Sequence, residues 1–276
     1  LSEWKMARAR MRRSRIPSPS ENLDDVARPK DRLVILDIAL QPKHLDPWLH
    51  HANTALGMDV FGLLHDLIPL VTPQFVKNET CHVFHERLLR STNYVTAYLA
   101  NSEHTGGDLR RFLDSYDAPQ KVIIVPLAQS LVSDANRDVG QQDSFSELMD
   151  KTTVPDMIQA LTKTPYVLVV GTLEVRKNLW QLATVWDRLR KQSGRALPKL
   201  VFAGRRGWLN DDFENLLMAS GRLGGWVEIV EEPDDTALSY LYRNCLFTVT
   251  VSFYEGWGLP IGESLAYGKT AVVSNT

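Results

Sequence analysis

The sequence has few cysteines and no long apolar stretch. Among its 276 residues only Cys81 and Cys245 carry a thiol, and they lie far apart in the chain. This composition argues against a disulfide-stabilised secreted domain and favours a reducing, cytoplasmic location. No stretch of about 18 consecutive apolar residues is present to cross a bilayer. The first residues also lack the apolar core of a secretory signal.

A strong net charge is absent, as are the common nucleotide-binding and metal-binding motifs. The 31 Lys and Arg residues and 33 Asp and Glu residues give a net charge of −2, so no nucleic-acid partner is expected. Neither a Walker loop nor a Gly-x-Gly-x-x-Gly fingerprint occurs. His82 and His85 lie one helical turn apart near Cys81, but no second ligand pair accompanies them, so a helix face is favoured over a zinc site. We therefore expect neither a metal ion nor another cofactor.

The length and the 44% hydrophobic content allow two domains, each with its own core. We predict a partial N-terminal domain over residues 31–128, a connection over 129–164 and an incomplete C-terminal domain over 165–276. Residues 1–30 form a basic, proline-containing arm, which is either a solvated helix with a linker, the favoured alternative, or a contact to an anionic membrane face. Because the first elements of one domain and the last elements of the other are not evident, we expect a chain that is shortened at both ends.

Predicted strands and helices alternate in both halves, which is typical of α/β domains with parallel sheets. In the N-terminal half we predict strands over 32–40, 58–64 and 121–125, and helices over 46–56, 80–100 and 103–116. In the C-terminal half we predict strands over 166–170, 200–203, 227–230, 246–251 and 270–274, and helices over 178–192, 211–217, 236–244 and 260–267.

The most informative segment is EGWGLPIGE, residues 255–263, which follows a predicted buried strand. Pro260 is suited to the first helical position, and the free N–H groups and positive dipole of that helix end suit a phosphate. Glu263, expected in the first turn, would repel a phosphate beside it but can accept hydrogen bonds from a ribose diol. Glu255 precedes the helix and can reach a group attached to the phosphates. A sugar nucleotide uses all three features.

Further candidate residues follow other predicted strands. Arg176 and Lys177 lie at a helix start, where cations oppose the helix dipole, so we expect an external anion such as a diphosphate. Gly204 and Arg205 follow the next strand and offer close backbone approach and positive potential. His65 follows the strand over 58–64, at the edge where open α/β sheets bind ligands. Acidic residues over 231–235 are equally consistent with contacts to a base and with capping of a helix.

Residues 255–263 resemble the paired-glutamate motif of the retaining glycosyltransferases of family 4, which have the GT-B fold of two Rossmann-like, doubly wound domains facing a cleft. The resemblance extends, in the family's order and spacing, through residues 64–69, 101–105, 121–126, 167–178, 200–208 and 238–245. It implies metal-independent transfer of a sugar from a nucleotide-diphosphate sugar to a glycan or lipid-linked acceptor, with retention. Residues 171–178 are most similar to mannosyl- and rhamnosyltransferases of bacterial surface polysaccharides, so GDP-mannose is the first expectation for the donor. Such an enzyme would work in the cytoplasm, with possible association at the inner membrane face.

The resemblance also assigns roles to residues. It implies that Glu255 orients sugar hydroxyls, that His65 stabilises charge near the donor phosphate, and that Lys177 binds the pyrophosphate. Many family members have an arginine directly after the glycine of the loop, whereas this chain has Thr172. The expected donor-binding residues are Gly171, Thr172, Arg176, Lys177, Gly204, Arg205, Gly256, Trp257, Gly258, Leu259 and Glu263. The alternatives are a GT-B sugar-nucleotide epimerase and a non-catalytic nucleotide-binding fragment.

Overall fold

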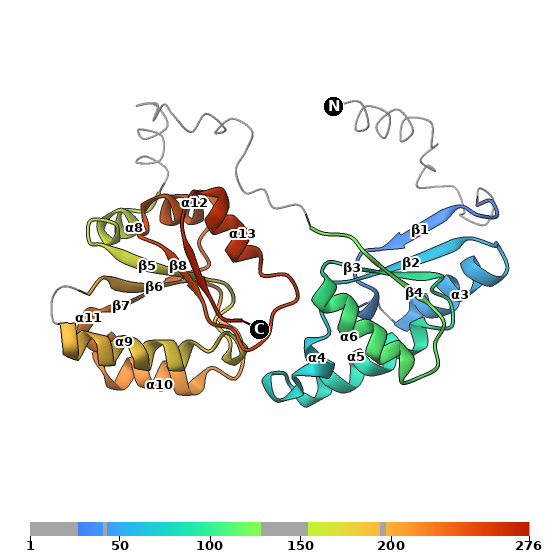
Figure 1. The fold of residues 1–276 in the computed structure, drawn as a ribbon, viewed down its shortest axis with the longest axis horizontal. Coiled ribbons are helices and arrows are strands. Elements are labelled where there is room, and N and C mark those ends of the chain that lie inside the picture. The colour runs from blue at the N-terminus through green and yellow to red at the C-terminus, as the bar shows by residue number, and fades with distance from the viewer. Residues whose placement is uncertain (1–26, 41–42, 128–153, 194–196, 276) are drawn as a thin grey trace, which may run out of the picture.

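The computed structural model describes residues 27–40, 43–127, 154–193 and 197–275. These residues form two parallel β-sheets that pack against helices (Figure 1). Most of the predicted N-terminal arm and of the predicted connection lies outside the described residues. Within the described part of the chain, no helix is both long enough and apolar enough to cross a membrane.

The first sheet has the strand order β1-β2-β3-β4, and all its neighbouring strands are parallel. Its helices pack around a core that includes Leu64, Leu88 and Tyr98. The strands are β1 (Arg32–Ile35), β2 (Asp59–Leu64), β3 (Ala97–Ala100) and β4 (Lys121–Ile124). The helices are α3 (Asp46–Thr54), α4 (Ile68–Val71), α5 (Asn78–Ser91) and α6 (Glu103–Asp114).

The strand predicted over 32–40 is shorter than expected. β1 ends at Ile35, and the chain then turns into a single 3-10 turn, Ile38–Leu40. Ile38 is buried against Gly62 of β2, where a Cβ on the glycine would lie 3.0 Å from the isoleucine Cβ. The chain therefore leaves the sheet after four residues, because doing so buries Ile38 in the space that the glycine leaves open.

The prediction of one long helix over 80–100 is wrong for the second half of that range. α5 ends at Ser91, and Ala97–Ala100 forms strand β3 between β2 and β4. Tyr94, Val95 and Tyr98 are buried, as are most residues of this stretch. Nearly continuous burial is the signature of an interior parallel strand rather than of an amphipathic helix.

The second sheet has the order β7-β6-β5-β8-β9, again with parallel neighbours. The order reverses between β5 and β8, which creates a topological switch point. The strands are β5 (Tyr166–Val170), β6 (Lys199–Gly204), β7 (Val227–Glu231), β8 (Thr248–Thr250) and β9 (Ala271–Val273). The helices are α8 (Asp156–Leu161), α9 (Leu179–Ser193), α10 (Asp211–Ala219), α11 (Gly221–Gly225), α12 (Asp235–Asn244) and α13 (Leu259–Ala266).

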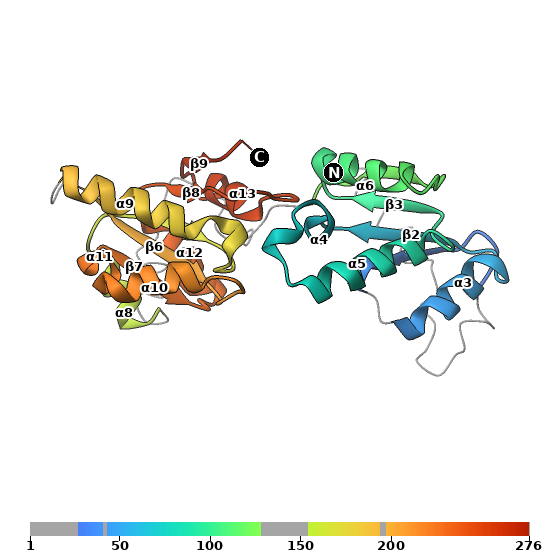
Figure 2. The same cartoon turned by 90° about the horizontal axis from the view of Figure 1, so that it is seen from below.

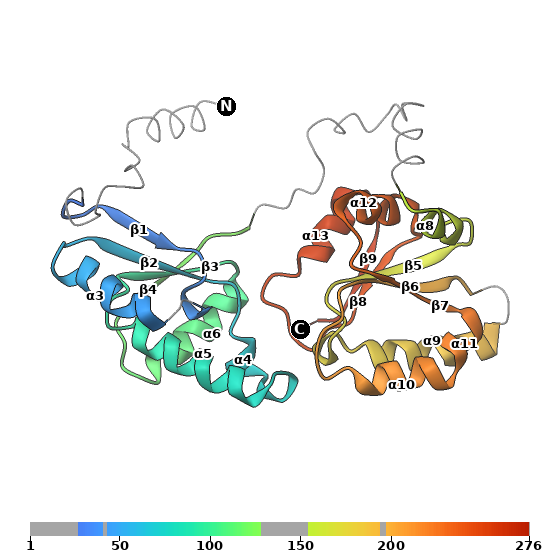
Figure 3. The same ribbon diagram turned by 180° about the vertical axis from the view of Figure 1, so that it is seen from behind.

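Alternate residues of β5 and β6 face two separate cores on the two sides of this sheet. Val167 and Phe202 pack with α9 and α10, whereas Leu168 and Val201 pack with α8 and α12. Figures 1 and 3 show α9 and α10 on one side of the sheet and α8 and α12 on the other. Ile158 of α8 belongs to the second core, so the packing of this domain begins before the residue 165 boundary that the sequence predicts.

The two domains meet where the segment between β8 and α13 extends toward the first domain (Figure 2). The rings of Phe75 and Phe253 stack across this contact with centroids 5.0 Å apart. Beside them, the indole N–H of Trp208 donates a hydrogen bond to the carbonyl of Phe75 at 2.9 Å. The carbonyl of Gly256 accepts a hydrogen bond from Ser102 at 2.6 Å.

Candidate functional site

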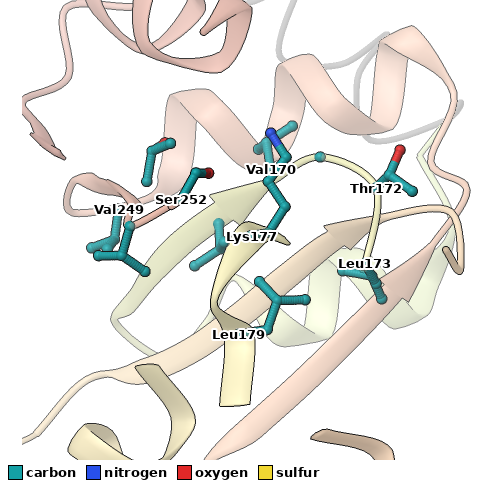
Figure 4. A pocket seen from close by; sticks show the side chains of 11 residues that line it. Val170, Thr172, Leu173, Lys177, Leu179, Val249 and Ser252 are labelled. Atoms are coloured by element: carbon teal, nitrogen blue, oxygen red, sulfur yellow. The ribbon is translucent and has the colours of Figure 1, made fainter. Parts of the chain in front are cut away.

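A small cavity marks the switch point between β5 and β8. Gly171 and Thr172 follow β5, Ser252 follows β8, and Lys177 ends the 3-10 turn Val175–Lys177. Figure 4 shows the Lys177 amine between the hydroxyl groups of Thr172 and Ser252. A Cβ on Gly171 would lie 3.3 Å from the Lys177 Cε, so the lysine side chain packs closely on this glycine. The ligand position of open parallel sheets is at such a switch point, and Gly171, Thr172 and Lys177 are brought together there.

Glu255 lies between two cations of the second domain. Its Oε1 is 2.5 Å from the Nζ of Lys177, and its Oε2 is 3.1 Å from a guanidinium nitrogen of Arg176. Arg176 also pairs with the buried carboxylate of Glu174 and donates a hydrogen bond to the carbonyl of Tyr254. The four charged side chains therefore form one network that fixes the Glu255 carboxylate.

The network determines the protonation state of Glu255. Burial alone would raise the pKa of its carboxyl group, but Lys177 and Arg176 outweigh this effect and lower the pKa below its ordinary value. Glu255 is consequently an anion at neutral pH. It can accept hydrogen bonds, but it has no proton to give to a leaving group.

The position of Arg176 does not fit the expectation that it contacts an external diphosphate. Only 8% of the residue is exposed, and its guanidinium faces Glu174 and Glu255. The argument from the helix dipole required an anion near Arg176 and Lys177. The protein itself supplies two anions, the carboxylates of Glu174 and Glu255. The sequence analysis missed Glu174, although its carboxyl group stands only two residues before Arg176.

Gly204 allows the backbone at the end of β6 to pack directly against the backbone at the end of β5. A Cβ at this position would lie 2.1 Å from the carbonyl oxygen of Gly171, so the ends of β5 and β6 can approach only because Gly204 has no side chain. The side chain of Arg205 is exposed and has no hydrogen bond or ion pair with another described residue. Arg206, in contrast, pairs with Glu214 and Glu231 at 3.0 Å each.

The backbone of His65 meets the Glu255 loop. A Cβ on Gly256 would lie 2.3 Å from the carbonyl oxygen of His65, which also accepts a hydrogen bond from Thr105 at 3.3 Å. The two predicted catalytic residues therefore belong to one contact between the domains, and the His65 side chain is exposed there. The adjacent Asp66 was not predicted as a site residue, and burial raises the pKa of its carboxyl group.

A larger cavity of about 290 Å³ opens beside this contact. Glu255, Gly256 and Trp257 line it from the second domain, and Ser102 and His104 line it from the first. The indole nitrogen of Trp257 is buried without a hydrogen-bond partner among the described residues. His65 is not among the lining residues. His104 was missed by the sequence analysis, although residues 101–105 follow a strand at the same sheet edge as His65.

Glu263 lies one residue further into its helix than the sequence analysis expected. Gly258, with a φ of +77°, precedes α13, which begins at Leu259, so Glu263 falls in the second turn. Its Oε2 accepts a hydrogen bond from the hydroxyl of Tyr242 at 2.7 Å. The carboxylate is thus oriented by α12. The described residues contain no group of three or more His, Cys, Asp and Glu side chains that could hold a metal ion.

Comparison with known proteins gives this arrangement a family context. Residues 150–276 match the family model of glycosyl transferases group 1. The chain is 38% identical over 110 residues to O-antigen chain mannosyltransferase B of Escherichia coli. That alignment covers 40% of this chain and 28% of the relative.

Solved structures show the same two-domain fold. The chain matches an Escherichia coli trehalose-6-phosphate protein bound to UDP-2-fluoro glucose with a TM-score of 0.63 and 15% identity, over 92% of this chain and 60% of that one. It matches an Anabaena protein in complex with UDP and glucose with a TM-score of 0.58 and 14% identity, over 89% and 59%. The sequence-based prediction of two Rossmann-like domains in the GT-B arrangement is confirmed, and this chain spans about 60% of the length of these structures.

Proposed function

We propose that the protein is a glycosyltransferase that moves a sugar from a nucleotide-diphosphate sugar to a glycan or lipid-linked acceptor. The observation that carries the proposal is the meeting of Lys177 and the ionised Glu255 at the switch point of a parallel sheet. The match of residues 150–276 to the glycosyl transferases group 1 supports it. In the proposed reaction no metal ion takes part and the anomeric configuration is retained.

The donor diphosphate binds at the switch point in this proposal. Lys177 has three N–H donors and uses one toward Glu255, which leaves two for phosphate oxygens. The guanidinium of Arg205, which pairs with no other described residue, follows the neighbouring strand and supplies a second cation, in the role that the sequence analysis considered for Arg176. Segment 256–259 leads into the N-terminal end of α13, where the helix dipole favours an anion. Glu263, oriented by Tyr242, accepts hydrogen bonds from the ribose hydroxyls.

The chemistry assigned to the side chains follows from their charge. Glu255 stays ionised, so it orients hydroxyl groups of the donor sugar and does not protonate the leaving group. As the bond between C1 and the phosphate oxygen breaks, that phosphate takes the proton of the acceptor hydroxyl, whose oxygen forms the new bond to C1. His65 donates a hydrogen bond toward the developing charge on the phosphate, an arrangement that stabilises such a transition state.

The sugar and the acceptor are proposed by similarity. The relative that is 38% identical is named an O-antigen chain mannosyltransferase, which supports mannose as the transferred sugar and GDP-mannose as the donor. A growing surface polysaccharide on a lipid carrier is then the acceptor class. We place the reaction in the cytoplasm, at the inner face of the membrane.

A donor and acceptor screen tests this function. The chain is incubated with GDP-mannose, UDP-glucose or dTDP-rhamnose, with and without a mannose-containing oligosaccharide, and released nucleoside diphosphate is measured. We expect release of GDP that depends on the acceptor, and NMR of the product should show the α-configuration of the donor. The absence of turnover with every donor would contradict the proposal, as would conversion of a sugar nucleotide to its epimer without an acceptor.

A further inference from the structure

One helix of the first domain contacts the residues on both sides of Glu255. Ser102, the residue that caps α6, donates a hydrogen bond to the carbonyl of Gly256 at 2.6 Å. The hydroxyl of Thr105, in the first turn of α6, lies 3.3 Å from the same carbonyl and 3.3 Å from the His65 carbonyl, and these two carbonyls share its one hydrogen. Because the two hydroxyl groups lie three residues apart, they face the same side of the helix.

The next turn of α6 continues this contact with a buried carboxylate. Asp108 accepts a hydrogen bond from the hydroxyl of Tyr254, the residue that precedes Glu255. The Asp108 side chain is 1% exposed, and its other oxygen pairs with Arg111. His104 packs its ring on that of Tyr254, with centroids 4.9 Å apart. A carboxylate buried to this degree needs such partners, so the Asp108–Tyr254 bond constrains both domains.

The second domain holds the same segment from the other side. Arg176 donates a hydrogen bond to the carbonyl of Tyr254, and its own carbonyl accepts one from the amide of Phe253 at 2.9 Å. These bonds attach the segment to its own sheet. The bonds from α6, in contrast, form only when the first domain lies against the second, and they reach Tyr254 and Gly256 on either side of Glu255.

We infer that Asp108 and Tyr254 are positioning residues through which the first domain fixes the carboxylate of Glu255. Packing of the two domains thereby completes the site, because the segment that carries Glu255 acquires its full set of hydrogen bonds only in their contact. The role of Glu255 in turnover rests on the function proposed above. The placement of the segment by α6 does not depend on that function and can be measured without activity.

Tyr254→Phe removes the hydroxyl group and keeps the ring that packs on His104. We expect turnover to fall roughly 10- to 100-fold, the usual effect of losing a hydrogen bond to a charged group that orients a reacting site. The affinity for free GDP should stay unchanged, because Tyr254 does not lie at the phosphate position. The matched control is Tyr116→Phe, which removes a hydroxyl that bonds to His85 at 2.6 Å beyond the far end of α6. This control should keep normal turnover.

Two further readouts separate positioning from a general structural effect. In a Glu255→Gln background, Tyr254→Phe should cause no additional loss of turnover, whereas additive losses would overturn the inference. Amide hydrogen exchange over residues 253–258 should become faster in Tyr254→Phe and not in Tyr116→Phe. Unchanged exchange would overturn the inference whatever the activity. Faster exchange in a protein that turns over no sugar nucleotide would support the positioning contact and refute the proposed function.

Discussion

Glu255 is held as a carboxylate by Lys177 and Arg176, and these two cations differ in what they can do for a ligand. Arg176 is buried and occupied by Glu174, Glu255 and the carbonyl of Tyr254. Lys177 lines the cavity at the switch point and bonds only to Glu255 among the hydrogen bonds described above. At the residue scale, the phosphate-binding cation is therefore Lys177 in the proposed function.

Replacing Lys177 with alanine tests this assignment. We expect Lys177→Ala to weaken GDP binding roughly 10- to 100-fold, since a charge-assisted hydrogen bond is worth about 1.5–3 kcal/mol. Binding of guanosine should change little, and calorimetry with both ligands measures the difference. Lys199→Ala, which removes a cation that pairs with Glu228 at 3.1 Å, is the matched control and should leave both affinities unchanged. Equal losses for GDP and guanosine in Lys177→Ala would show that this lysine supports the fold instead.

Asp66 gives a prediction about pH. Burial raises the pKa of its carboxyl group, and the amide of Ile68 and the charge of Arg176 only partly offset this effect. A carboxyl whose folded pKa lies above its unfolded pKa stabilises the fold at acidic pH, and this contribution is lost as the pH rises through the folded pKa. Asparagine can still accept the hydrogen bond from Ile68 but does not ionise. The Tm of Asp66→Asn, relative to the wild type, should therefore increase between about pH 4 and about pH 7.

Asp187 supplies a control in which the Tm difference between variant and wild type should change with pH in the opposite direction. Hydrogen bonds from Lys191 and Arg190 lower the pKa of its carboxyl group, so its contribution to stability is present at neutral pH and is lost as the pH falls through the folded pKa. Relative to the wild type, the Tm of Asp187→Asn should decrease as the pH rises from about 2 to about 4 and should change little between about pH 4 and about pH 7. A difference in Tm that does not vary with pH in Asp66→Asn would contradict the account of Asp66.

At the scale of elements, the ends of β5 and β6 depend on one close backbone approach. We expect Gly204→Ala to destabilise the protein by about 1–3 kcal/mol, because the new Cβ would meet the Gly171 carbonyl, which is rigid backbone. Urea unfolding measures the change. Gly107→Ala in α6 is the control, since its Cβ would meet only the end of the Arg111 side chain at 3.7 Å. This control should be neutral or slightly stabilising. Similar stability of Gly204→Ala and the wild type would contradict the packing argument.

Most elements of the second domain could be predicted from the sequence, because most of its strands lie in apolar runs and its longer helices are amphipathic. The short helices α8 and α11 were not predicted. The elements of the first domain were harder to predict. Residues 94–100 are apolar except for Thr96, and only their pairing with β2 and β4 distinguishes strand β3 from a continuation of α5. The early end of β1 depends on Ile38 filling the space over Gly62, a contact between distant residues that periodicity does not reveal. The segment 255–263 was placed correctly in a strand–loop–helix unit, but its helix starts at Leu259 and leaves Glu263 in the second turn.

At the scale of the whole molecule, the candidate site is built from both domains. The sequence placed His65 and Glu255 in different domains, and the structure brings the His65 carbonyl against Gly256, the residue after Glu255. The partners of the Glu255 segment in α6, Asp108 above all, could not be predicted, since nothing in a single sequence pairs residue 108 with residue 254. The buried pair of Arg176 with Glu174 escaped prediction for the same physical reason, because burial is decided by the packed fold.

The most direct test of the account is the rate at which Glu255→Gln releases GDP from GDP-mannose in the presence of an acceptor. Glutamine keeps the shape of the side chain but lacks the charge that Lys177 and Arg176 stabilise. We predict a rate roughly 10²–10³-fold below that of the wild type, the usual effect of removing one preorganised electrostatic contact. Glu214→Gln, which removes a surface carboxylate paired with Arg206, should retain the wild-type rate. A folded Glu255→Gln variant that transfers sugar at the wild-type rate would contradict the central claim that the ionised Glu255 acts on the donor sugar.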